Sequence, residues 1–375
     1  MIEVVYLISR AKKTAGPVNQ ALNILIGLNR LPNVHARLVT LAPEMKDFSW
    51  LQRFKDNNIE VVQLKQPIWL TWRCIPLLKK FIKKNNIDIV HSAGYRADFV
   101  NMFLRNNVKT VTTQRSLPNE IVEKFPKLLK PFFERMHLWI IKRMGRIVAC
   151  SESMMHTLRC DYNLDAYAVQ NGVNTDFFVP VDKKTKEELR IKLGFNPNSL
   201  LYLVLGSLRP RKNVGLIIDA FRKIDNPNIE LVLVGDGPMR EELENRANGD
   251  SRIHFIGMTG QSINFLHASD ILISSALAEG LPNTVLEAFA CGLPCVLSDI
   301  GPHSELLRSS KFGVLFRCNN LESLKECLKV SLSWDVQKMS RDVRREAEEA
   351  HSVKSLAENY LKIYKSCQPV TRQEQ

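Results

Sequence analysis

Short apolar runs rich in β-branched residues recur along this chain, and helical stretches separate many of them. Strands at such intervals need long crossover connections, which are typical of a parallel sheet. The runs form two series, residues 2–9, 36–41, 59–64, 87–92, 108–113 and 146–151, then residues 199–207, 229–237, 252–257, 270–275, 293–299 and 313–317. The sequence therefore predicts an α/β protein with two doubly wound, Rossmann-like domains.

The break between the two series lies in residues 171–190, which contain an Asn-Gly turn, a proline and a charge run, as linkers do. A length of 375 residues suffices for two domains. We expect a first domain over residues 1–172, a second over 173–345, and a C-terminal helix over 346–375 that packs back toward the first domain. Two such domains would face each other across a cleft at the carboxyl ends of their sheets, where folds of this class bind ligands.

The composition, 45% hydrophobic and 24% charged residues, is that of a folded globular protein. No window approaches the ~18 apolar residues of a membrane span, and the chain does not open with a secretory leader pattern. Its eight cysteines form no C-x-x-C pair. No D-x-D and no cluster with metal-ligand spacing occurs. We therefore expect a cytoplasmic protein with reduced thiols, no metal site and no cofactor.

The most informative segment is residues 278–301, which follows a predicted strand. Glu279 precedes a Gly-Leu-Pro-Asn loop, and a helix beginning near Thr284 would carry Glu287 in its first turn. Ionised carboxylates accept hydrogen bonds from sugar or ribose hydroxyls, and helix N-terminal amides favour an anion such as a pyrophosphate. The ordinary alternative is that Glu287 stabilises its helix and Glu279 is a solvated loop residue.

Arg209, Arg211 and Lys212 lie in a loop between a strand and a helix. Such a position suits the neutralisation of phosphates, although most basic loops are simply solvated.

Glycines follow other strands, at Gly235 and Gly237 and, in the first domain, at Gly16. A glycine lets a ligand approach the backbone closely, and it also permits an ordinary tight turn. The pattern is not G-x-G-x-x-G, which disfavours a nicotinamide cofactor.

The order of these segments along the chain resembles that of a known family. GSLRPRKN, LVGDGPMREEL, IHFIGMT, the E-x7-E segment ALAEGLPNTVLEAFACGLPCVLSDIG and GVLF together resemble the carboxyl-terminal half of the retaining glycosyltransferases of family four, which have the GT-B fold. The first half is similar more loosely, in AGPVNQALNILIGL, DIVHSAGYRAD, VTTQRSLP, VACSESMMHTL and VQNGVNTDFF. The resemblance spans nearly the whole chain and extends to members in bacterial polysaccharide biosynthesis.

The resemblance implies a role for several residues. Glu279 would contact hydroxyls of the donor sugar, Glu287 would hold the ribose, and Lys212 would stabilise the charge on the departing diphosphate. The implied donor-binding positions are Gly16, Ser207, Gly235, Gly237, Gly257, Leu281, Pro282, Asn283, Thr284 and Glu287.

Two positions depart from the family pattern. Ser207 stands where these enzymes commonly have an arginine, and we expect Arg209 or Arg211 to replace it. Ala93 stands where many members have the second histidine of His-x-His, so His91 is either an acceptor-side residue or part of the core. The expected acceptor-side residues are His91, Arg96 and Arg115.

The net charge of +13 is concentrated in residues 79–146, which carry 15 Lys and Arg but 5 Asp and Glu. Residues 125–146 interleave basic, aromatic and aliphatic side chains at helical intervals, a pattern that suits an anionic membrane surface. A buried helix with a solvated basic face gives the same pattern. Nucleic-acid binding is not expected, because no recognition motif is visible.

These features lead to one expected function. It is a metal-independent, retaining glycosyltransferase of the hexosyltransferase type, moving a sugar from a nucleotide sugar to a hydroxyl acceptor. The expected acceptor is a lipid-linked glycan intermediate at the inner face of the membrane. Two alternatives remain: a nucleotide-sugar 2-epimerase, and a non-catalytic nucleotide-sugar-binding protein on the same scaffold.

Overall fold

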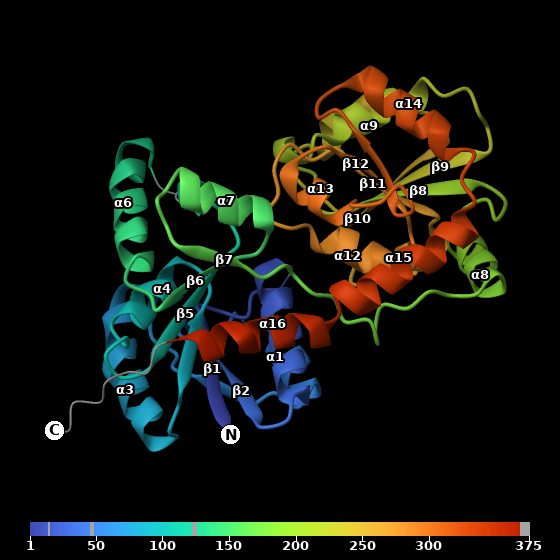
Figure 1. Cartoon of the computed structure of the whole chain (residues 1–375). Helices are drawn as coiled ribbons and strands as arrows, with labels where there is room; N and C mark the ends of the chain where they lie inside the picture. The colour runs from blue at the N-terminus through green and yellow to red at the C-terminus, as the bar shows by residue number, and fades with distance from the viewer. Residues whose placement is uncertain (14–15, 46–48, 122–125, 368–375) are drawn as a thin grey trace. The chain divides into compact units, whose positions relative to one another are not determined.

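The computed structural model describes residues 1–13, 16–45, 49–121 and 126–367 (Figure 1). The chain forms two compact units, one of Met1–Gly172 together with the residues from Val353 on, and one of Val173–Ser352. Residue 345, where the sequence places the end of the second domain, lies inside a helix of the second unit, Val336–Ala350.

The first unit is built on a seven-stranded parallel sheet in the order β3-β2-β1-β4-β5-β6-β7. The strands are β1 (Ile2–Ile8), β2 (Val34–Thr40), β3 (Val61–Gln63), β4 (Ile89–Ser92), β5 (Lys109–Gln114), β6 (Arg146–Ala149) and β7 (Ala166–Ala168). The helices are α1 (Gly16–Arg30), α2 (Leu51–Asp56), η2 (Ile68–Arg73), α3 (Cys74–Lys84), α4 (Tyr95–Met102), α5 (Pro118–Ile121), η4 (Lys127–Leu129), α6 (Lys130–Ile141), α7 (Glu152–Cys160) and α16 (Val353–Ser366). The sequence analysis did not identify β7, which has only three residues.

The last helix, α16, belongs to the first unit because it packs along α1 (Figure 1). A Cβ atom on Gly27 of α1 would lie 2.1 Å from the backbone oxygen of Val353, so the glycine permits this close approach. Tyr360 and Tyr364 of α16 are fully buried in the core beneath β1 and β4. Helix α16 is therefore part of the core of the unit in which the chain begins.

The second unit is built on a six-stranded parallel sheet in the order β10-β9-β8-β11-β12-β13. The strands are β8 (Leu200–Leu205), β9 (Ile229–Val234), β10 (Ile253–Gly257), β11 (Ile271–Ser274), β12 (Cys295–Ser298) and β13 (Gly313–Phe316). The helices are α8 (Lys183–Leu193), η5 (Pro210–Lys212), α9 (Val214–Arg222), α10 (Arg240–Ala247), α11 (Ser262–Ala268), α12 (Asn283–Ala290), α13 (Gly301–Leu306), α14 (Leu321–Ser331) and α15 (Val336–Ala350).

The segment expected to be a linker contains a helix, α8. The Asp182 carboxylate accepts from the backbone N–H of Thr185 and caps it. Arg190 is buried, pairs with Asp270 and donates to the backbone oxygen of Ala268 at 2.7 Å. The charge run is therefore partly buried, and it anchors α8 to the second unit.

Both sheets reverse their strand order once, between β1 and β4 in the first unit and between β8 and β11 in the second. All the strand pairs are parallel and every central strand is flanked by helices, which confirms the predicted doubly wound α/β fold. In such folds the carboxyl ends of the two strands at the reversal frame the ligand site. In the part of the chain that the structure describes, no helix combines the length and apolar character of a membrane span.

Candidate functional site

The loops that follow β8 and β11 meet at the reversal point of the second sheet. The Ser275 hydroxyl donates to the backbone oxygen of Asn213 at 2.8 Å, and the N–H of Leu277 donates to that of Arg211 at 2.8 Å. These bonds hold the two loops side by side. Consequently Lys212 and Glu279, which follow different strands, form an ion pair.

The Lys212–Glu279 pair is mostly enclosed. The Lys212 side chain is 19% exposed and that of Glu279 is 9% exposed. Removing two charges this far from water is costly unless both are hydrogen-bonded to partners. A ligand that binds Lys212 and breaks this ion pair must therefore also provide hydrogen bonds for Glu279.

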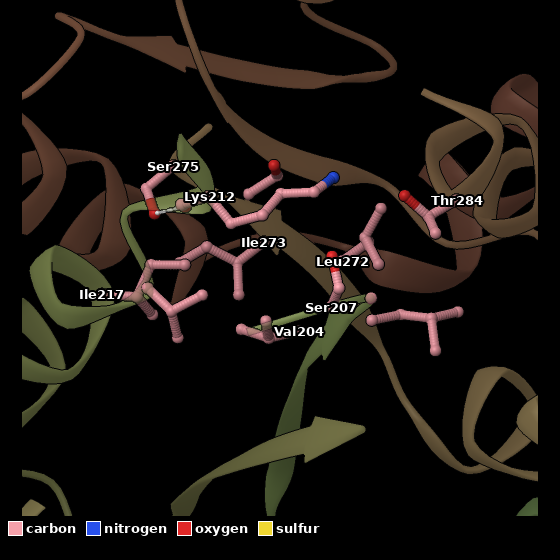
Figure 2. A pocket seen from close by; sticks show the side chains of 12 residues that line it. Val204, Ser207, Lys212, Ile217, Leu272, Ile273, Ser275 and Thr284 are labelled. Carbon is pink, nitrogen blue, oxygen red and sulfur yellow. Dashed lines mark hydrogen bonds between the residues drawn. The ribbon is translucent and has the colours of Figure 1, made fainter. Parts of the chain in front are cut away.

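An open pocket lies beside this pair (Figure 2). The Lys212 side chain extends along it in the direction of Thr284, and Ser207 lies below the tip of Lys212 in this view. Apolar side chains of β8 and β11, including Val204 and Leu272, form its floor. The pocket thus offers one ammonium group and the hydroxyl groups of Ser207, Ser274, Ser275 and Thr284 above an apolar base.

Arg209 and Arg211 are exposed on the same loop. Neither has an ion-pair partner within the described residues, in contrast to Lys212. Their guanidinium groups can therefore bind an anionic ligand without first breaking a contact. Ser207, at the position expected to lack the family arginine, is also exposed.

Three predicted donor-binding glycines join neighbouring loops of the sheet. The backbone of Gly235 has φ +140°, and a Cβ there would lie 1.8 Å from the oxygen of Gly206. A Cβ on Gly237 would lie 2.3 Å from the oxygen of Leu208, while the N–H of Gly235 donates to Gly257 at 2.9 Å. Gly235 and Gly237 are therefore required for the packing of these loops, whatever ligand they also border.

The helix after the Glu279 loop, α12, begins at Asn283, so Glu287 lies in its second turn rather than in the first as expected. Leu281 and Pro282 are buried and fix the entry into the helix. No side chain of the described residues caps the helix at Pro282, and Thr284 of its first turn lines the pocket. The stabilising first-turn role considered for Glu287 is therefore wrong.

In the first unit, His91 is fully buried. Its Nδ1 lies 2.8 Å from the Tyr364 hydroxyl and its Nε2 lies 2.7 Å from the Thr113 hydroxyl. Burial lowers the pKa of His91 well below its usual range, so the ring is neutral. His91 is thus a core residue in this structure, and any influence on an acceptor would act through its two partners.

The other expected acceptor-side residues hold loops at the carboxyl edge of the first sheet. Arg96 donates to the Thr71 hydroxyl at 2.7 Å and to the backbone oxygens of Gln66 and Pro67 at 3.0 and 3.1 Å. Arg115 donates to the side-chain oxygen of Asn171. Both arginines keep polar loops together near this edge.

Gly16 is exposed at the first position of α1. The two residues before it, 14–15, lie outside the described residues. The expected closure of this loop over a pyrophosphate therefore stays a prediction.

Two polar groups at the sheet edges escaped the sequence analysis. Asp98 is fully buried, accepts from the hydroxyls of Ser92 and Thr112 at 2.7 Å each, and lies 3.4 Å from His137. His303 is buried behind the Glu279 loop. Asp98 and His303 are isolated polar residues that belong to no motif, so the sequence does not reveal their positions in the fold.

Within residues 125–146, η4 and α6 cover residues 127–141 and Arg146 begins β6, while Phe125 lies outside the described residues. His137, Ile140 and Ile141 are buried, whereas Leu128 is 94% exposed, Phe132 is 61% exposed and Trp139 is 47% exposed. The helix therefore has a buried face and also an exposed aromatic face.

The residues 1–13, 16–45, 49–121 and 126–367 contain no group of three or more His, Cys, Asp and Glu side chains placed to hold a metal ion.

Two family models match consecutive parts of the chain. The model described as Glycosyltransferase Family 4 matches residues 16–177, and the model described as Glycosyl transferases group 1 matches residues 185–350. The second match includes Lys212, Glu279 and Glu287.

Among characterised relatives, the chain is 26% identical over 265 residues to the Escherichia coli UDP-Gal:alpha-D-GlcNAc-diphosphoundecaprenol alpha-1,3-galactosyltransferase, covering 67% of this chain and 68% of that protein. It is 23% identical over 244 residues to the Bacillus anthracis N-acetyl-alpha-D-glucosaminyl L-malate synthase, covering 62% of each chain.

Solved structures share the architecture over nearly the whole chain. Anabaena Alr3699/HepE in complex with UDP and glucose has a TM-score of 0.78 at 18% identity, covering 98% of this chain and 100% of that one. WaaG, a glycosyltransferase involved in lipopolysaccharide biosynthesis, has a TM-score of 0.70 at 17% identity, covering 97% and 100%. At these identities the likeness establishes the fold.

Proposed function

Because the chain belongs to the glycosyltransferases of family 4 and group 1 and has their GT-B fold, we propose that it transfers a hexose from a nucleotide sugar to a hydroxyl acceptor with retention at the anomeric carbon. The observation that carries the proposal is the Lys212–Glu279 pair at the reversal point of the second sheet, flanked by the exposed Arg209 and Arg211. Together they offer cations for a diphosphate and an acceptor carboxylate for sugar hydroxyls.

In the proposed reaction, Lys212 leaves Glu279 and contacts the diphosphate, while Glu279 accepts hydrogen bonds from the transferred sugar. The bond between the anomeric carbon and the diphosphate oxygen breaks, and the acceptor oxygen forms its bond to carbon on the same face. The acceptor proton passes to a diphosphate oxygen. Lys212 lowers the barrier because its charge is already placed where negative charge develops. No divalent metal is needed for this charge balance.

The names of the relatives support the proposed substrates. The Escherichia coli relative uses UDP-Gal and a diphosphoundecaprenol acceptor, and the Anabaena structure contains UDP and glucose. We propose for this chain a nucleotide-sugar donor and a lipid-linked glycan acceptor in polysaccharide biosynthesis. The nucleotide and the sugar are left to experiment.

Donor binding is tested by the shift in unfolding temperature with UDP, GDP, ADP and TDP and their hexose derivatives, since a ligand that binds only the folded state stabilises it. The wild-type protein should shift with one nucleotide, and Lys212→Met and Glu287→Ala should lose the shift. The assay is run with and without EDTA, which should make no difference. Absence of a shift with every nucleotide contradicts the proposal.

The two alternative functions give different products. A 2-epimerase would convert the nucleotide sugar without any added acceptor. A binding protein would show the thermal shift but would release no nucleoside diphosphate with any lipid extract. The proposed transferase releases nucleoside diphosphate only when an acceptor is present.

We propose a membrane contact of the first unit, which a second observation supports. Two exposed aromatic segments of the first unit, η2 with Trp69 (78% exposed) and Trp72, and α6 with Phe132 and Trp139, both contact α4. Helix α3, which directly follows η2, carries four lysines, and α6 begins with a lysine. Tryptophan at this exposure beside lysines suits the interface of an anionic bilayer. A lipid-linked acceptor would then reach the enzyme at the inner face of the membrane.

Co-sedimentation with vesicles tests this contact. Binding to phosphatidylcholine vesicles that contain phosphatidylglycerol should exceed binding to phosphatidylcholine alone and should fall with salt. The variant Trp69→Ser/Trp72→Ser should bind less. The matched control Phe177→Ser, an exposed aromatic residue of the second unit, should not change binding. Equal binding to both vesicle types contradicts an anionic membrane surface.

A further inference from the structure

His303 lies on α13 directly after β12, and its side chain is fully buried. Its Nδ1 lies 3.0 Å from the hydroxyl oxygen of Ser298 and 3.0 Å from the backbone oxygen of Ser298. The Ser298 hydroxyl in turn donates to the backbone oxygen of Ala276 at 2.6 Å. A continuous chain of hydrogen bonds thus joins α13 to the loop after β11.

These partners fix which nitrogen of His303 carries the proton. A backbone oxygen can only accept, and the proton of the Ser298 hydroxyl is already used toward Ala276. Both short contacts therefore require a proton on Nδ1, because otherwise lone pairs would face each other. The ring is neutral, because burial lowers the pKa of His303 to about 4.

The loop held by Ser298 is the one that positions both proposed donor-binding groups. Ser275 and Leu277, on either side of Ala276, bind the backbone of residues 211–213, which carries Lys212. Glu279 follows three residues after Ala276.

We infer that His303 is a positioning residue of the donor site: its Nδ1–H, through Ser298, fixes the Ala276 segment and thereby the place of Glu279 beside Lys212. The inference rests on the proposed function for the identity of the ligand, but not for the hydrogen-bond chain. Loss of the His303 Nδ1–H should therefore weaken recognition of the sugar, since in the proposed function Glu279 contacts the sugar and the nucleotide has other contacts.

Three substitutions separate this role from others. In His303→Asn the amide N–H takes the place of Nδ1–H, in His303→Gln a polar group takes the place of Nε2, and in His303→Leu both are lost. The measured quantities are the dissociation constants for the nucleoside diphosphate and for the nucleotide sugar, together with kcat and KM. We expect His303→Asn to behave like the wild type. His303→Gln and His303→Leu should lose about 10-fold in affinity for the nucleotide sugar, the size of one hydrogen bond, without loss of affinity for the nucleoside diphosphate.

Amide hydrogen exchange provides a readout that needs no ligand. The N–H of Leu277, bound to Arg211, should exchange about 10-fold faster in His303→Gln and His303→Leu than in the wild type, and at the wild-type rate in His303→Asn. If this pattern holds while no nucleotide sugar binds, the proposed function fails and the positioning role stands. If His303→Gln is restored and His303→Asn is not, Nε2 is the working atom and the inference is overturned. Equal behaviour of all three variants also overturns it.

Discussion

The ammonium group of Lys212 pairs with the carboxylate of Glu279, although 67 positions separate them and they follow different strands. In the absence of donor each group neutralises the other. Donor binding must therefore exchange this ion pair for a contact between Lys212 and a diphosphate and for contacts between Glu279 and sugar hydroxyls.

This exchange predicts opposite effects for two substitutions. Lys212→Met should weaken binding of the nucleoside diphosphate and lower kcat by about 100- to 1000-fold, as the loss of a charge-stabilising group does. Glu279→Gln should lower transfer but leave nucleoside diphosphate affinity equal or higher, because Lys212 is then released. Calorimetric titration of both variants measures the difference. Parallel losses of nucleoside diphosphate affinity would contradict the exchange.

Arg209 and Arg211 are expected to differ from each other. Both are exposed and neither is in an ion pair of the described residues, so replacing either with Ala should change the free energy of unfolding by less than about 0.5 kcal/mol. If one of these two arginines replaces the family arginine that is absent at Ser207, substitution of that arginine alone should weaken binding of the nucleoside diphosphate. Titration of Arg209→Ala and Arg211→Ala decides between them, and equal mild effects would show that neither does so.

Gly235→Ala should destabilise the second unit by more than about 2 kcal/mol, because the added Cβ would overlap the backbone of Gly206 and the positive φ disfavours any side chain. Gly249→Ala is the matched control. It also has a positive φ, +71°, but nothing lies within 4 Å of the new Cβ. Its cost should be about 1 kcal/mol. Urea unfolding measures both, and equal costs would show that loop contact at Gly235 is unimportant.

Gly27→Ala tests the contact between α1 and α16. Its Cβ would meet the backbone oxygen of Val353 at 2.1 Å and the side chain of Ala357 at 2.8 Å, so we expect a loss of about 2 kcal/mol. Gly215→Ala, also in a helix, would meet only the flexible side chain of Arg246. That control should change the free energy of unfolding little, since alanine also favours the helix. A tolerated Gly27→Ala would mean that α16 is loosely attached.

The buried histidines predict how stability depends on pH. The pKa of His303 in the folded chain is about 4, against 6.5 as its ordinary value. Between these values the unfolded chain binds one more proton than the folded chain, so stability falls as the pH decreases from 6.5 toward 4. The slope is at most about 1.4 kcal/mol per pH unit for one histidine, and about 3 kcal/mol over the window.

His351, whose pKa burial also lowers to about 4, adds to this effect with the same sign. Urea unfolding at several pH values measures the total slope. His303→Asn should remove the part due to His303 and give a shallower dependence. An unchanged slope in that variant would contradict the assignment to His303.

The sequence predicted the two parallel sheets because their strands are continuous apolar runs that are buried on both faces. That Lys212 and Glu279 contact one donor was implied by the family resemblance, whereas the residue pattern itself placed each of them only in a loop after a strand. The sequence did not predict β7, which is too short to show a pattern. It also did not predict α8, because the charged residues of this segment resemble a linker, whereas in the structure Arg190 is buried against Asp270.

His303 was not predictable, because its role depends on which strands are neighbours. Ser298 ends β12 and Ala276 follows β11, and these strands lie side by side only in the folded sheet. Glu287 was expected in the first turn because the helix was predicted to begin near Thr284. The helix begins one residue earlier, at Asn283 directly after Pro282, and this places Glu287 in the second turn. Both cases depend on geometry that residue spacing does not encode.

The most direct test of the account is the transfer of labelled hexose from each nucleotide sugar to a lipid-linked acceptor fraction, with wild-type protein and Lys212→Met in parallel. The account predicts that label enters the lipid fraction from one donor, with one nucleoside diphosphate released per sugar and with the anomeric configuration of the donor retained in the product. Lys212→Met should transfer almost nothing. Release of nucleoside diphosphate without acceptor, an inverted product, or equal transfer by Lys212→Met would contradict it.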